Sequence, residues 1–243
     1  GHKIHTVKSE DGKITAKQIQ KVTKSHNDSD MAIHMVMPKL VFIALPTECG
    51  TNYTEKELED IYKVCKENDM YLYIDGARLG YGLVAQDTDL KIEDIPNLCD
   101  VFYIGGTKQG ALFGEAVVIV NDVLKKDFRY HIKQKGAMLA KGRLLGIQFE
   151  TLMNNDLYFT LSRHAVNLAM KIRDALIAKG YKLLYDSYTN QQFVIIQNNK
   201  LKELNKEFTF FKVKDIDENN TAIRICTSWA TTEENVDKLI AKL

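Results

Sequence analysis

Tyr73-Ile-Asp-Gly-Ala-Arg78 is a strand-like apolar segment that stops abruptly at polar residues, and Tyr103-Ile-Gly-Gly-Thr-Lys-Gln109 shows the same arrangement further along the chain. Asp75 ends the first apolar run and Lys108 follows the second, 33 positions later (108 − 75 = 33). That interval leaves room for a crossover between neighbouring parallel strands. Because residues just past the carboxyl ends of such strands face the ligand crevice, we expect Asp75 and Lys108 to share a site.

Sequence patterns around these two segments predict a β–α–β unit. Leu40-Val-Phe-Ile-Ala-Leu45 is apolar throughout, as a buried parallel strand is. Thr54-Glu-Lys-Glu57 has the pattern of a capping box, and apolar residues then recur at helical spacing until the next strand at 71–74. Further segments expected to be regular are strands at 4–7, 101–104 and 116–120 and a long helix at 157–178.

A change of pattern near residue 155 predicts two domains. Residues 1–155 read as a large α/β domain with a mainly parallel sheet, and residues 156–243 as a small α+β domain. The second part consists of short strands separated by turns, followed by a helix that Thr231-Thr-Glu-Glu234 is predicted to cap.

Composition excludes several classes of partner. The chain has 243 residues, of which 45% are hydrophobic, and its 33 basic and 32 acidic residues leave a net charge of +1. This balance gives no electrostatic basis for binding nucleic acid or an anionic membrane. No apolar run approaches the roughly 18 residues of a membrane span. The four cysteines form no Cys-x-x-Cys pair, which predicts reduced thiols and a cytoplasmic protein, and the histidines show no metal-ligand spacing.

The pairing of an acid with a lysine predicts chemistry with pyridoxal 5'-phosphate. A lysine forms a Schiff base with the aldehyde of that cofactor, and a carboxylate pairs with its pyridinium nitrogen. Gly106 would let the ring and phosphate approach the backbone, and the Thr107 hydroxyl would donate to the phosphate. Two simpler readings stay open, namely a surface lysine in a glycine-rich turn and an Asp75–Arg78 ion pair.

These motifs resemble the low-specificity L-threonine aldolases, which belong to the β-eliminating lyase group of enzymes with the aspartate-aminotransferase-like fold. The resemblance starts at Tyr73–Arg78, continues through Thr107-Lys-Gln-Gly-Ala-Leu-Phe-Gly114 and Gly136-Ala-Met-Leu-Ala-Lys-Gly142, and reaches Thr227-Ser-Trp-Ala-Thr-Thr-Glu-Glu234. It implies an α/β large domain of the pyridoxal-phosphate transferase type, N-terminally incomplete, with a small C-terminal α+β domain. We therefore expect a chain that lacks the segment preceding Gly1 in the family.

The resemblance also implies roles for individual residues. Lys108 would be the Schiff-base lysine and Asp75 the partner of the pyridine nitrogen, while Arg78 and Arg224 would bind the carboxylate of the substrate. A guanidinium suits that task because its fork binds carboxylates bidentately. His34 falls about where the family carries a histidine near the substrate hydroxyl, and an imidazole accepts a proton near neutral pH. A packing or surface histidine is the alternative.

The expected reaction is cleavage of the Cα–Cβ bond of a β-hydroxy-α-amino acid, such as L-threonine or L-allo-threonine, to glycine and an aldehyde. A β-eliminating lyase or an aminotransferase would use the same lysine, aspartate and arginine. A fragment without activity is the remaining alternative. The resemblance implies a homodimer or homotetramer.

Overall fold

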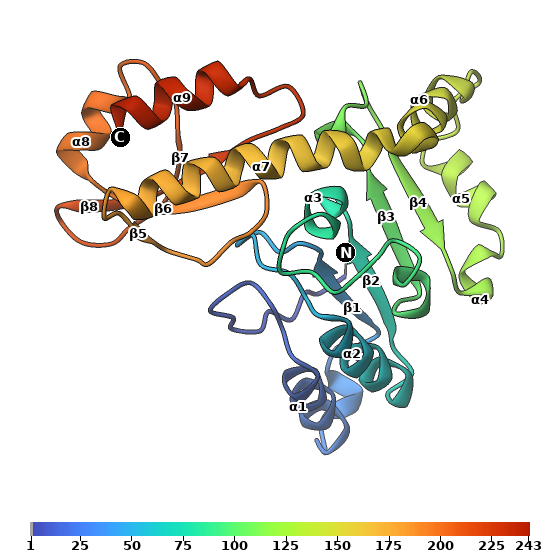
Figure 1. Cartoon of the computed structure of the whole chain (residues 1–243). Helices are drawn as coiled ribbons and strands as arrows, with labels where there is room; N and C mark the ends of the chain where they lie inside the picture. The colour runs from blue at the N-terminus through green and yellow to red at the C-terminus, as the bar shows by residue number, and fades with distance from the viewer. Residues whose placement is uncertain (1) are drawn as a thin grey trace.

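The computed structural model describes residues 2–243, and its first part is built around a mixed four-stranded sheet (Figure 1). The strand order is β1-β2-β3-β4, in which β1, β2 and β3 are parallel and β4 is antiparallel. Leu40 pairs with Tyr71 and Ala44 with Asp75, so Asp75 lies at the carboxyl edge of the parallel strands. The strands are β1 (Leu40–Ala44), β2 (Tyr71–Asp75), β3 (Val101–Gly105) and β4 (Glu115–Ile119).

The predicted β–α–β unit is confirmed, with α2 (Glu55–Glu67) connecting β1 to β2. Thr54 caps α2 in the expected way: its side chain accepts from the Glu57 N–H, while the Glu57 carboxylate accepts from the Thr54 N–H. The apolar side of α2, including Leu58 and Ile61, packs into the core beneath the sheet. Burying each such side chain stabilises the fold by roughly 1.5–3 kcal/mol relative to exposure.

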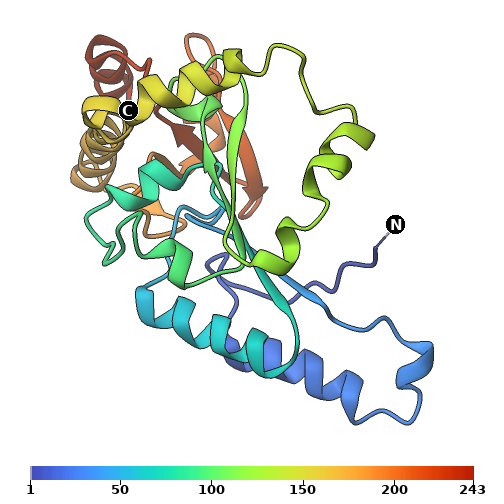
Figure 2. The same ribbon diagram turned by 90° about the vertical axis from the view of Figure 1, so that its right-hand side faces the viewer.

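Helices cover one face of this sheet, and the other face is largely open. Inward-facing residues of β1 and β2 are buried, whereas Phe42, on the other face of β1, is 57% exposed. The remaining helical segments of the first part are α1 (Ala16–Asn27), η1 (Ala32–His34), α3 (Leu79–Leu83), η2 (Ile95–Asn97), η3 (Thr107–Gln109), α4 (Asp122–Lys125), α5 (Phe128–Gln134), α6 (Arg143–Met153) and η4 (Asn154–Asp156). In Figure 2, α4 and α5 lie to the right of the strands of this sheet.

A second, antiparallel sheet forms the C-terminal part, with strand order β5-β6-β8-β7. Its strands are β5 (Lys182–Leu183), β6 (Gln191–Gln197), β7 (Phe211–Asp215) and β8 (Asn220–Cys226), and its helices are α8 (Asn198–Leu204) and α9 (Glu233–Lys242). Its apolar core includes Leu176, Val194 and Ile223.

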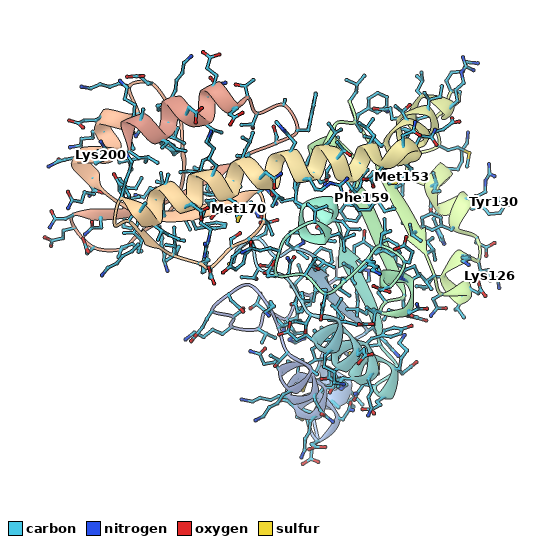
Figure 3. All side chains as sticks on the ribbon, in the orientation of Figure 1. Lys126, Tyr130, Met153, Phe159, Met170 and Lys200 are labelled. Carbon is cyan, nitrogen blue, oxygen red and sulfur yellow. The ribbon has the colours of Figure 1, made fainter. Side chains whose placement is uncertain are left out.

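The long helix α7 (Leu157–Ala178) has the predicted bounds and belongs to both parts of the molecule (Figure 1). Its first half packs against α3 and α6, and its second half lies over β6 and α9. Figure 3 labels Phe159 and Met170 on these two halves. The domain division at 155/156 therefore stays a prediction, because one helix supplies core side chains on both sides of it.

Two local expectations are wrong. Residues 4–7 form no strand, since no neighbouring strand pairs with them, and Ile4 is 83% exposed. Thr232, not Thr231, caps α9, because the Thr231 hydroxyl instead accepts from the Ser228 N–H at 2.8 Å. Within residues 2–243 we find no helix long and apolar enough to cross a membrane.

Candidate active site

Asp75 ends β2 with its carboxylate held in a defined orientation. Its Oδ1 atom accepts from the Ala77 N–H at 2.9 Å and from the Tyr103 hydroxyl at 2.5 Å. Loss of solvent, followed by the hydrogen bond to Asp75 and the Asp75 charge, raises the pKa of Tyr103, so this phenol remains a donor. Within residues 2–243, Oδ2 makes no hydrogen bond, which leaves one carboxylate oxygen for a cationic N–H.

Gly76 allows the ends of β2 and β3 to approach each other. A Cβ atom at this position would lie 1.8 Å from the Tyr103 carbonyl oxygen, so any side chain would push the strands apart. The close approach lets the Gly105 N–H donate to the Gly76 carbonyl at 2.9 Å. The turn that carries Lys108 therefore starts beside Asp75.

Lys108 lies in η3, immediately past β3, and its side chain is exposed. The buried Tyr81 holds the backbone there, because its hydroxyl donates to the Lys108 carbonyl and accepts from the Trp229 N–H. Burial raises the pKa of Tyr81 to about 12, so the phenol stays protonated at neutral pH. Lys108 is thus fixed at its backbone while its amine is free to reach a ligand.

Arg78, which directly precedes α3, and Arg224, which lies in β8 of the second sheet, meet at one carboxylate. The Nη1 atom of Arg78 lies 3.1 Å from Glu48 Oε1, and that of Arg224 lies 3.6 Å from Glu48 Oε2. Arg224 is also positioned by Gln191, whose Oε1 accepts from it at 3.2 Å, and by the Phe211 ring, 4.6 Å from its Cζ atom. Both guanidiniums are largely buried.

The charges of Arg78, Arg224 and Glu48 all affect the pKa of the Cys226 thiol. Although part of Cys226 reaches solvent, neighbouring protein removes water from the thiol and raises its pKa, and Glu48 adds to this effect. The positive charges of Arg224, Arg78 and Lys108 act in the opposite direction. Among these charges, the two arginines lower the pKa of this thiol more than Lys108 does.

Gly106 and Thr107, the predicted phosphate donors, already donate hydrogen bonds to a carboxylate of the chain. The carboxylate of Glu115 accepts from the Gly106 N–H at 2.5 Å and from the Thr107 hydroxyl at 2.7 Å. A phosphate at these donors would have to displace a group of its own charge. Their role in phosphate binding stays a prediction, and this geometry does not favour it.

His34 is not brought to this site. It lies in η1, six residues before β1 begins, whereas Asp75 is the last residue of β2 and Lys108 lies just past β3. Figure 1 shows the segment between α1 and β1 beside α1, at the far end of the strand. The direction of β1 explains this position. In a parallel sheet, a residue that precedes a strand lies at the amino-terminal edge, whereas a residue that follows a strand lies at the carboxyl-terminal edge.

Three residues of this arrangement were not singled out by the sequence pattern. Glu48 follows the carboxyl end of β1, and the rule that selected Asp75 would have found it. Tyr103 was read only as part of a strand, although alternation places it on the same face as Asp75. Gln191 carried no local signal, because its contact with Arg224 depends on the pairing of β6 with β8.

Comparisons with known proteins agree with this architecture. The model of the Beta-eliminating lyase family matches residues 1–199. A low specificity L-threonine aldolase of Pseudomonas sp. (strain NCIMB 10558) is 31% identical over the whole chain and 68% of its own length, and one of Pseudomonas aeruginosa is 29% identical over 98% of this chain and 67% of its own length.

Among solved structures, the threonine aldolase of Leishmania major superposes with a TM-score of 0.94 at 45% identity, covering 99% of this chain and 69% of that one. The chain thus spans about two thirds of the length of these relatives. The likeness confirms the predicted fold class, an α/β large domain followed by a small α+β unit.

Proposed function

Because the chain belongs to the Beta-eliminating lyase family, and within it to the low-specificity L-threonine aldolases, we propose that it cleaves L-threonine or L-allo-threonine to glycine and acetaldehyde with pyridoxal 5'-phosphate. The observation that supports this most is the meeting of Arg78 and Arg224 at one carboxylate, at the edge of the sheet where Arg78 follows β2 and Lys108 follows β3. A pair of guanidiniums is a suitable receptor for the carboxylate of an amino acid.

Lys108 and Asp75 suit the aldehyde and the ring nitrogen of the cofactor. When bound, pyridoxal phosphate supplies an aldehyde that condenses with amines and a ring that takes up electrons. Lys108 would hold the aldehyde, and the free Oδ2 of Asp75 would hold a proton on the ring nitrogen. The hydrogen bond from Tyr103 keeps that carboxylate oriented.

The arginines determine the orientation of the substrate. With the carboxylate fixed by Arg78 and Arg224, rotation about the bond to Cα is restricted, and the Cα–Cβ bond is held in one direction. Their positive charges also favour the anionic carboxylate over a neutral amide. A homodimer or homotetramer and a cytoplasmic location remain part of the proposal, and four free cysteines support a reducing compartment.

Product analysis with a lysine variant tests this function. Supplied with pyridoxal phosphate and threonine, the chain is expected to release glycine and acetaldehyde. It should also develop the visible absorbance band that the cofactor gains when its aldehyde joins a lysine. Lys108→Ala should lose both, whereas Lys126→Ala, at an exposed position in the outer segment labelled in Figure 3, should keep both.

Three results would contradict parts of the proposal. Release of 2-oxobutanoate and ammonia from threonine would indicate elimination, and amino transfer to an oxo acid would indicate an aminotransferase. An absorbance band that survives in Lys108→Ala would show that another lysine binds the aldehyde.

A further inference from the structure

The two guanidiniums of the candidate substrate site are well buried but incompletely bonded. The side chain of Arg78 is 12% exposed and that of Arg224 is 21% exposed. Among the described residues 2–243, Glu48 contacts only one nitrogen of each, and the buried Nε atom of Arg224 has no hydrogen-bond partner. Buried donors without partners are costly, so this pair of side chains is suited to bind a further acceptor.

The carboxylate that bridges the pair is weakly held. Glu48 lies in the loop between β1 and α2, and its side chain is 69% exposed. Among residues 2–243, its carboxylate bonds only to Arg78 and Arg224, at 3.1 and 3.6 Å. Ion pairs with an exposed partner contribute little, because water and salt screen them. Glu48 can therefore leave the arginines without disrupting the core.

We propose that Glu48 is a built-in competitor for the carboxylate of the substrate, which must expel it from Arg78 and Arg224 in order to bind. The inference rests on the proposed function, in which these two arginines receive that carboxylate. Glu48 has the same charge and the same two planar oxygens as the α-carboxylate of an amino acid. The two groups cannot occupy the arginine pair together, because like charges repel at that distance.

Competition of this kind lowers the affinity of the site for every carboxylate. While Glu48 occupies the arginines, a ligand binds only to the fraction of molecules in which the pair is free. The affinity for carboxylates then depends on Glu48 as well as on the two arginines. Glu48 also neutralises one of two neighbouring positive charges when the site is empty, which keeps the guanidiniums close together.

An acetate titration of the full chain tests the competition directly. Acetate offers a carboxylate and no amine, and the Nε–H signals of Arg78 and Arg224 in ¹⁵N-arginine-labelled protein report its binding. Because each exposed ion pair contributes modestly, Glu48→Gln is expected to bind acetate about three- to tenfold more tightly than the unaltered chain. Glu93→Gln, which removes the same charge at an exposed position with no ion pair among the described residues, should bind acetate as the unaltered chain does.

Equal or weaker acetate binding by Glu48→Gln would overturn the inference, as would an equal gain in Glu93→Gln, which would indicate a general charge effect. The titration requires neither cofactor nor cleavage of threonine. A chain that fails to cleave threonine would therefore leave the acetate result intact, and a failed titration would leave the proposed reaction standing.

Discussion

Arg224 shows how a single side chain is prepared for a ligand. It stands on β8 opposite Phe193 on one side and Phe211 on the other, and its guanidinium lies 4.6 Å from the centre of the Phe211 ring. Gln191 accepts from one of its nitrogens. The planar, delocalised charge of an arginine suits both the ring and a carboxylate, and a lysine lacks this geometry.

Arg224→Lys is expected to raise the KM for threonine by roughly tenfold, because an ammonium keeps the charge but loses the stacking and the second donor. The turnover number should change less, since the substitution removes binding rather than chemistry. Steady-state kinetics would check this, with Arg163→Lys on the exposed side of α7 as the control. A KM equal to that of the unaltered chain would remove Arg224 from the carboxylate site.

At the scale of elements, the contact between α3 and α7 joins the site to the long helix. Gly80 of α3 lies so close to α7 that a Cβ atom would be 2.4 Å from the Ser162 hydroxyl and 2.7 Å from the Tyr158 ring. The Gly80 N–H donates to the Tyr158 hydroxyl at 3.2 Å. Since α3 starts at Leu79, directly after Arg78, this packing also positions Arg78.

Gly80→Ala is expected to destabilise the chain by about 1–3 kcal/mol, because the added methyl group overpacks the junction between the two helices. Gly146→Ala offers a matched control in α6, where a Cβ atom would meet nothing within 4 Å. There the change should be neutral or stabilise by up to about 1 kcal/mol through helix propensity. Urea unfolding would measure both, and equal stability of the two variants would refute the close packing.

At the scale of the whole molecule, Tyr53 connects the N-terminal segment to the core of the first sheet. It is 1% exposed, and its hydroxyl accepts from the Ile14 N–H at 2.8 Å. Burial raises the pKa of Tyr53 from 10.0 to about 12, although the hydrogen bond from Ile14 opposes the shift. The neutral phenol is thus favoured in the folded state more than in the unfolded state.

A raised pKa stabilises the fold below the unfolded pKa, and this contribution is lost as the pH rises through the folded value. As the pH rises from 10 to about 12, ionisation of the Tyr53 phenol should therefore lower the free energy of unfolding by on the order of 2–3 kcal/mol. Tyr53→Phe should lose less stability over the same interval. Unfolding in urea at pH 9 and pH 11.5 would compare the two, and parallel losses would show that Tyr53 does not titrate in this range.

Local patterns in the sequence were sufficient to determine the elements and the edge of the sheet where chemistry is expected. The helix at 157–178, the cap at Thr54 and the β–α–β unit depend on spacing within a few residues, and all three are confirmed. Asp75 and Lys108 were singled out because the first ends its strand and the second lies just past the next strand.

The tertiary structure alone decided which distant residues meet. Arg78 and Arg224 are 146 positions apart (224 − 78 = 146) and approach each other because α7 packs against α3 and η3 in the first part and against β6 in the second. The structure also decides that His34 lies ahead of β1, because its position along the chain does not indicate which end of a strand it reaches. The position of Glu48 after β1 could be read from the sequence, but its contact with the two arginines could not, because that contact joins residues far apart in the chain.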